Sequence, residues 1–325
     1  MDGMIGLLAA PFAGCMLIAA LHCYMGLHVV KRGVIFVDLA LAQLAALGAA
    51  VALLVVPLVF GEALHEHHAA PPEYRQGDAS GAASAADGAG EGEEEGAKHW
   101  LMENTPYALS LLFAFAGAAI FALGRFRDDL VPHEAIIGIV FVVSAALAVL
   151  VLSRAPHGHE KMETMLVGSI LFVNWRDVLV TFLLYLPLGV LHVLVRRPLL
   201  RISEDMKSAE AAGMPVRAWD FLFYATFGLM VTQSVRMAGV LVVFSYLIIP
   251  AVCASMLARS FARRLVLAWG IAVAASVIGL ALSALKDLPT GPALVATFGG
   301  ILAVCAAARR WAPKGRALDI AHRRA

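Results

Sequence analysis

The chain has 325 residues, of which 61% are hydrophobic and only 15% are charged. Soluble domains have about 45–50% apolar and about 25% charged residues, so this composition excludes an ordinary soluble protein. The apolar runs are long and unbroken, whereas the strands of an outer-membrane barrel alternate in polarity, so a barrel is excluded as well. We therefore expect an all-α protein whose helices cross a lipid bilayer repeatedly, with no nucleic-acid partner.

Nine apolar runs are candidates for these helices, because about 20 apolar residues are needed to cross the hydrocarbon core of a bilayer. They lie near residues 4–27, 36–60, 107–124, 133–154, 170–195, 219–235, 239–258, 264–285 and 293–309. Five short segments between or after these runs hold 18 of the 25 Lys and Arg residues. Cytoplasmic loops are enriched in Lys and Arg, so this pattern predicts eight or nine spans with the N-terminus outside and the C-terminus inside.

The formal net charge of +1 conceals an uneven distribution along the chain. Residues 61–106 hold 10 acidic and 2 basic side chains, which leaves 14 acidic and 23 basic side chains elsewhere. This Ala-, Gly- and Ser-rich segment predicts a disordered loop outside the membrane. The expected organisation is thus two helices in 1–60, the loop, a helical region in 107–310 and a cytoplasmic tail in 311–325.

Two basic segments predict short cytoplasmic helices that could dock a soluble partner. In residues 201–218, Ser203 and Asp205 suit a helix N-cap, while Gly213 and Pro215 suit its end. Residues 250–264, PAVCASMLARSFARR, predict a second short helix that leaves the membrane at its proline. The alternative for this second segment is a spanning helix whose basic end reaches the membrane surface.

Two polar residues interrupt the apolar run FVDLALAQLAALGA (residues 36–49) and are costly inside a bilayer. Asp38 could cap its helix or pair with Arg32, and Gln43 could hydrogen-bond across a contact between helices. Alternatively, both side chains could line a polar path through the bundle. Five positions separate them by about 140° around an ideal helix, so they are poorly placed to hold one ion together.

Histidine and glutamate residues gather on the predicted outer side, where they could hold metal ions weakly. Imidazole suits Zn, Cu, Ni and Fe, and carboxylate extends the choice toward Mn. The candidate ligands are His65, Glu66, His67, His68, His99, His157, His159 and Glu160. The alternative is a solvated polar loop that happens to be rich in histidine.

Enzymatic motifs are absent from the sequence: there is no Walker A loop, GxSxG or HExxH pattern. The four cysteines (Cys15, Cys23, Cys253 and Cys305) show no zinc-binding spacing and are interpreted as small buried hydrophobic residues. We therefore expect a transporter, a channel or a receptor that holds no cofactor and does not hydrolyse ATP itself.

Several motifs in order carry a resemblance to a known family. They are HVVKRGVIFVDLALAQLAALG, SAEAAGMPV, GVLVVFSYLIIPA, a helix with Gly279 and Ser283, and DLPTGPA. Together they resemble the permease subunits of zinc, manganese and chelated-iron ABC importers, over residues 14–308 apart from the insertion. The resemblance implies the fold of the vitamin B12-type importer permease and a homodimer in the cell inner membrane. It also implies a separate ABC ATPase and an extracytoplasmic metal-binding protein as partners.

The same resemblance assigns roles to individual residues. Residues 250–264 would supply the helix that couples to the ATPase, through Pro250, Ser255, Arg259, Arg263 and Arg264. The family carries an acidic residue four positions before a histidine in its second helix, and Gln43 stands where that histidine belongs, with Asp38 shifted by one place.

Two alternatives to import of a free Zn, Mn or Fe ion stay open: an ATP-independent metal carrier or channel, and an importer of a chelated metal. A membrane-embedded metal sensor is a third, weaker possibility.

Overall fold

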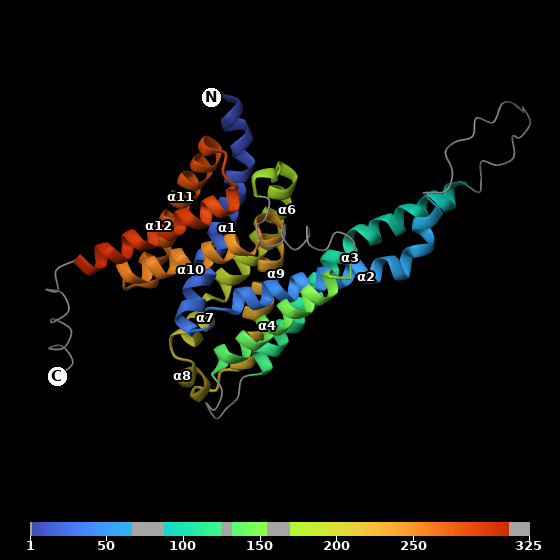
Figure 1. Ribbon diagram of the computed structural model, residues 1–325. Helices are drawn as coiled ribbons and strands as arrows, with labels where there is room; N and C mark the ends of the chain where they lie inside the picture. Colours follow the sequence, from blue (N-terminus) through green and yellow to red (C-terminus); the bar gives the residue numbers. More distant parts are fainter. Residues whose placement is uncertain (1, 67–87, 125–131, 155–169, 312–325) are drawn as a thin grey trace, which may run out of the picture.

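The computed structural model describes residues 2–66, 88–124, 132–154 and 170–311, and every regular element in these ranges is helical. Figure 1 shows the arrangement of the elements. The elements are α1 (Asp2–Arg32), α2 (Val37–Glu66), α3 (Gly88–Leu123), α4 (His133–Leu152), η1 (Ile170–Phe172), α6 (Trp175–Leu194), α7 (Arg196–Glu204), α8 (Met206–Ala211), α9 (Val216–Ala238), α10 (Val240–Leu257), α11 (Phe261–Lys286) and α12 (Thr290–Trp311). The prediction of an all-helical membrane protein is confirmed.

Eight helices in the described ranges are long and apolar enough to cross a membrane, within the eight or nine predicted from the sequence. The remaining predicted run, 219–235, forms α9, which is not among the eight. Most of α9 is buried inside the bundle, where it also carries polar residues such as Asp220 and Gln233. A helix covered by other helices needs no continuous apolar face toward lipid, so its composition is freer.

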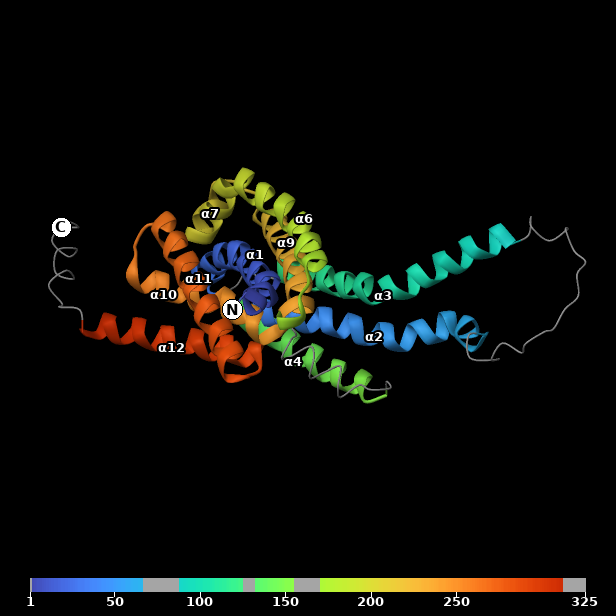
Figure 2. The ribbon, with the colours of Figure 1, turned by 90° about the horizontal axis from the view of Figure 1, so that it is seen from above.

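The helices form two groups that meet along α9. In one group α2 packs against α3 and α4, and α3 packs against α9; in the other, α1 packs against α10 and α11, and α12 covers α10 and α11. Figure 2 shows α2 and α3 extending side by side away from the bundle, with α12 on the opposite flank. Each group of helices has a hydrophobic core with aromatic rings. In the core of the first group, Phe121 of α3 meets Tyr224 of α9 with ring centroids 5.8 Å apart. In the core of the second group, the ring centroids of Tyr246 and Phe298 are 4.7 Å apart.

Two glycines with positive φ separate successive long helices. At Gly33 (φ 68°) α1 ends in a Schellman motif, in which the Val34 amide donates to the Val29 carbonyl and the Gly33 amide to the Val30 carbonyl. Gly239 (φ 80°, ψ 159°) separates α9 from α10 in a conformation that is essentially open only to glycine. At each of these glycines one helix ends and the chain begins another helix in a new direction.

The short helix predicted in 201–218 is present as α8, with α7 directly before it. Asp205 caps α8 by accepting a hydrogen bond from the Ser208 amide, and Gly213 (φ 76°) follows the helix end, as predicted. Ser203 differs from the prediction, because it lies within α7 and is buried. Both short helices are amphipathic, with Ile202, Ala209 and Val216 forming a small core beneath them.

The other predicted short helix, in residues 250–264, does not form as a separate element. Pro250 lies inside α10 and is buried, α10 continues to Leu257, and α11 begins at Phe261. Proline is accommodated there within a helix packed on its neighbours. The predicted loop 61–106 is also shorter than expected, since α2 extends to Glu66 and α3 begins at Gly88.

Candidate functional site

The first candidate residue, Asp38, lies in the first turn of α2 and is buried, with 1% of its surface exposed. Its Oδ1 atom has no hydrogen-bond partner among the described residues. A carboxylate at a helix N-terminus is favoured by the helix dipole, but this position alone does not compensate for its removal from water. Asp38 does not pair with Arg32, whose ion-pair partner is Asp220, so that interpretation of the sequence was wrong.

Gln43, the second candidate, lies five residues after Asp38 in α2 and is only half-buried. The two residues therefore differ in exposure, as expected from their five-residue separation around the helix. The structure does not bring them together as one ligand pair within a single chain. Nearby, the start of α2 is fixed by Glu134 of α4, whose Oε1 accepts a hydrogen bond of 3.2 Å from the Phe36 amide.

Three of the eight predicted outer metal ligands lie in the described helices. His65 and Glu66 lie in the last turn of α2, and His99 lies in α3. The other predicted ligands lie outside the described residues: His67, His68, His157, His159 and Glu160. Within the described part of the chain, no group of three or more His, Cys, Asp or Glu side chains could hold a metal ion. The cysteines are free thiols, and Cys15, Cys23 and Cys253 are buried, in agreement with their interpretation as small hydrophobic residues.

The residues predicted to couple to an ATPase surround the connection between α10 and α11. Arg259 and Arg263 are exposed, Ser255 is half-buried, and Pro250 is buried. Arg264 is oriented back onto the connection, where its Nε donates to the Ala258 carbonyl at 3.0 Å. The structure thus places a basic turn here, with the Arg259 and Arg263 side chains at its surface.

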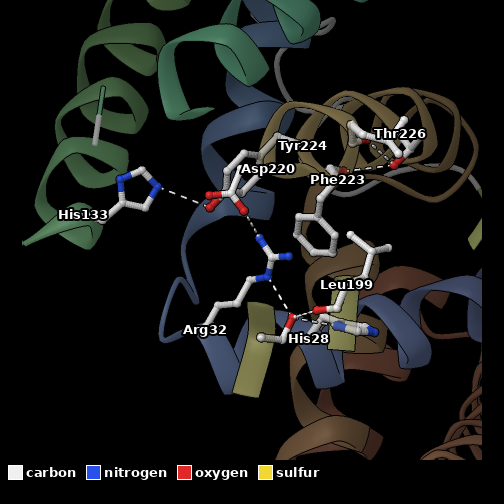
Figure 3. Close-up of polar contacts among 10 residues, drawn as sticks. His28, Arg32, His133, Leu199, Asp220, Phe223, Tyr224 and Thr226 are labelled. Atoms are coloured by element: carbon white, nitrogen blue, oxygen red, sulfur yellow. Dashed lines mark hydrogen bonds and ion pairs between the residues drawn. The ribbon is translucent and has the colours of Figure 1, made fainter. Parts of the chain in front are cut away.

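A buried polar network that sequence inspection missed joins the end of α1 to α7 and α9 (Figure 3). Arg32 Nη1 lies 2.6 Å from Asp220 Oδ1 of α9, and Arg32 Nε donates to Ser203 Oγ of α7 at 2.9 Å. The two charged side chains are 0% and 3% exposed. The guanidinium also lies over the Phe223 ring, 4.1 Å from its centroid, a favourable cation–π arrangement.

His28, one turn before Arg32 on α1, completes this network. Its Nδ1 lies 2.8 Å from Ser203 Oγ, and the Ser203 hydroxyl donates to the Leu199 carbonyl at 2.8 Å. A hydroxyl has one proton, so Ser203 accepts hydrogen bonds from both Arg32 Nε and His28 Nδ1 while it donates to Leu199. The spacing of four residues between His28 and Arg32 puts both on one face of α1, and this spacing was the available sequence signal.

The same face of α1 carries further buried polar atoms. Tyr24 lies one turn before His28, with ring centroids 4.7 Å apart, and 5.7 Å from the ring of His192 on α6. His192 Nε2 lies 2.9 Å from Thr226 Oγ1. Four atoms of this region have no hydrogen-bond partner among the described residues: Tyr24 Oη, His28 Nε2, Arg32 Nη2 and His192 Nδ1. Next to it, His133 Nε2 of α4 lies 3.2 Å from the Tyr224 hydroxyl (Figure 3).

The all-helical fold and its eight candidate spans define a multi-pass membrane protein. The family model for the ABC 3 transport family matches residues 99–309, and the chain belongs to that family. The fold agrees with a solved structure, PsaBC from Streptococcus pneumoniae in complex with Fab: the TM-score is 0.64 at 19% identity, over 92% of this chain and 90% of that one. A second structure, an inward-facing conformation of a putative metal-chelate type ABC transporter, has a TM-score of 0.60 at 17% identity, over 91% and 84% of the two chains.

Curated relatives match a part of the chain. The manganese transport system membrane protein MntC of Halalkalibacterium halodurans is 26% identical over 169 residues, which are 52% of this chain and 58% of the relative. MntC of Listeria monocytogenes is 26% identical over 58% of this chain and 69% of the relative. The chelated iron transport system membrane protein YfeD of Yersinia pestis is 27% identical over 52% and 57%. The chain thus spans between about half and two thirds of the length of these relatives.

Proposed function

We propose that this protein is the permease subunit of an ABC importer for a divalent transition metal ion. The observation that carries this proposal is the match of the ABC 3 transport family over residues 99–309. The names of the relatives support the substrate class, because they describe manganese and chelated-iron transport membrane proteins. The permease would give alternating access, as two helical bundles rock when ATP binds to a separate ATPase.

In this proposal the metal ion is cargo, and it passes α2. Asp38 supplies a buried carboxylate with a free oxygen, and Gln43 supplies an amide oxygen further along the helix. Oxygen ligands suit Mn²⁺ better than they suit Zn²⁺, which prefers imidazole and thiolate. Asp38 and Gln43 of one α2 helix are too far apart around its axis to enclose an ion together. A second copy of the chain would therefore contribute its own Asp38 and Gln43 to a shared path.

The proposed assembly has three kinds of component. Two copies of this chain span the inner membrane, two ABC ATPases bind on the cytoplasmic side, and a metal-binding protein delivers the ion outside. ATP is hydrolysed on the ATPases. Two exposed surfaces are suited to receive the ATPase: the basic turn with Arg259 and Arg263, and the paired short helices α7 and α8.

The test is metal uptake into proteoliposomes that contain this chain with its ATPase and binding protein. Uptake of Zn²⁺, Mn²⁺ and Fe²⁺ is compared with ATP, without ATP and with an ATPase whose Walker lysine is replaced. We expect uptake only with ATP and the intact ATPase. Uptake that persists without the ATPase would instead support an ATP-independent carrier.

Two substitutions in α2 test the path itself. Asp38→Ala should abolish uptake, and Gln43→His should shift the preference toward Zn²⁺, because imidazole is the better zinc ligand. If all three metals are transported equally by the wild type and both variants, these residues only hold helices together. If no free ion is transported but a chelated metal is, the importer of a chelate is the correct alternative.

A further inference from the structure

The network around Arg32 is placed where the two groups of helices and the short helices meet. Arg32 belongs to α1, which packs on α10 and α11, whereas Asp220 belongs to α9, which packs on α2 and α3. Ser203 lies in the last turn of α7, immediately before Asp205 caps α8. One guanidinium group therefore contacts both helix groups and the junction of α7 with α8.

Three side chains in the last two turns of α1 bond to this junction. His28 and Arg32 bind Ser203, and Lys31 forms an ion pair of 2.7 Å with the neighbouring Glu204. The bonds to Ser203 are buried, whereas the side chain of Glu204 is 60% exposed. Water competes for the exposed pair but not for the buried bonds, so the buried bonds define the geometry of the junction.

The geometry requires an arginine and not merely a positive charge. Arg32 uses two different nitrogens, Nε for Ser203 and Nη1 for Asp220, and its planar group stacks on Phe223. A lysine carries one nitrogen on a flexible chain and cannot reproduce this fork. Replacing buried ion pairs by apolar residues often costs little stability, so such a pair is better explained by the arrangement it specifies than by the energy it adds.

We propose that Arg32, with His28 and Ser203, is a positioning clamp that ties the α7–α8 junction to α1 and α9. The clamp rests on the proposed function, with α7 and α8 as the surface that receives the ATPase. When the ATPase displaces α7 and α8, a fixed junction carries the displacement into both helix groups, while a loose junction lets the short helices move alone. Arg32 is thus a positioning residue for energy coupling, and it does not contact the transported ion.

The experiment uses the complete complex with its ATPase and metal-binding protein in proteoliposomes. Arg32→Lys and Ser203→Ala are compared with the wild type, and Glu204→Gln is the matched control, since it breaks the exposed pair on the same junction. Metal transported per ATP hydrolysed is measured, together with thermal stability and the amount of ATPase bound. Arg32→Lys and Ser203→Ala should still bind the ATPase and hydrolyse ATP. The metal transported per ATP should fall by at least about five-fold, which is the lower end of typical coupling factors between two sites. Glu204→Gln should match the wild type.

Two results would overturn the clamp. In the first, both variants transport as much metal per ATP as the wild type. In the second, transport and ATP hydrolysis fall in parallel with the fraction of folded protein, which means that Arg32 only supports the fold. A wild-type complex without any ATP-driven uptake would refute the proposed function itself, and the clamp would then lose its basis.

Discussion

Gly26 of α1 lies directly against the main-chain carbonyl of Leu247 of α10. A Cβ atom at position 26 would lie 2.0 Å from the Leu247 oxygen, far inside van der Waals contact. Glycine is therefore required for α1 and α10 to approach as closely as they do, in the way that small residues allow close packing between membrane helices. A similar approach exists at Gly48 of α2, where a Cβ atom would lie 2.4 Å from the Leu109 oxygen of α3.

Gly26→Ala should lower the stability of the protein. The added methyl group meets backbone rather than a movable side chain, so we expect the upper part of the range of about 1–3 kcal/mol for overpacking, or more. Thermal unfolding in detergent measures the loss. Gly270→Ala in α11 is the control, because nothing lies within 4 Å of a Cβ atom there, and a helical Gly→Ala change should be neutral or slightly stabilising. Equal stability of the two variants would contradict the packing seen here.

Asp38→Asn should separate function from stability. The substitution removes a buried charge whose Oδ1 has no partner, so the folded state should be unchanged or more stable, by about 1–3 kcal/mol. If Asp38 lies on the path of the metal ion, uptake should nevertheless fall strongly, because a neutral amide holds a divalent cation poorly. Unfolding temperature and metal uptake are measured on the same preparation. A variant that is less stable and still transports would show that Asp38 serves the fold.

The buried pair of Arg32 with Asp220 should respond very differently to single and double substitution. Arg32→Met alone leaves the Asp220 carboxylate buried without its cation, at a cost of about 3–5 kcal/mol. Arg32→Met combined with Asp220→Leu should recover most of this loss. Lys31→Met, which breaks the more exposed pair with Glu204, should cost about 1 kcal/mol or less. A double variant as unstable as the sum of its parts would show that the two side chains act independently.

Deletion of residues 67–87 should leave transport at saturating metal unchanged. This segment carries His67, His68 and the acidic residues between α2 and α3, which would concentrate cations near the entrance but would not form the path. Initial uptake rates over a range of metal concentrations should therefore show a modest loss of apparent affinity. Complete loss of uptake at every concentration would mean that the segment is essential, as the sensor alternative requires.

Replacing Arg259 and Arg263 by Glu tests which exposed surface receives the ATPase. If the basic turn docks the ATPase, the double variant should lose the ATPase during purification while its unfolding temperature is unchanged, because both side chains are exposed. The matched change on the other surface is Arg201→Glu with Lys207→Glu, on the exposed faces of α7 and α8. Loss of the ATPase only in this second variant would assign docking to α7 and α8.

Local patterns in the sequence predicted the class of protein and most helices. Hydropathy identified the spans, Asp205 and Gly213 marked α8, and the ordered motifs indicated the family that the match over residues 99–309 confirms. Local reasoning failed for residues 250–264, because Pro250 was interpreted as the place where a separate short helix leaves the membrane. Packing on neighbouring helices keeps Pro250 inside α10 instead.

The sequence by itself determined that the chain lies in a membrane, since the cost of placing polar groups in lipid acts on each segment separately. Only the tertiary structure decided which buried groups meet. Arg32 reaches Ser203 and Asp220 across 171 and 188 positions of the chain, and Asp38 is left without that partner. No local spacing encodes such contacts, because they depend on how whole helices cross and which of their faces become buried together.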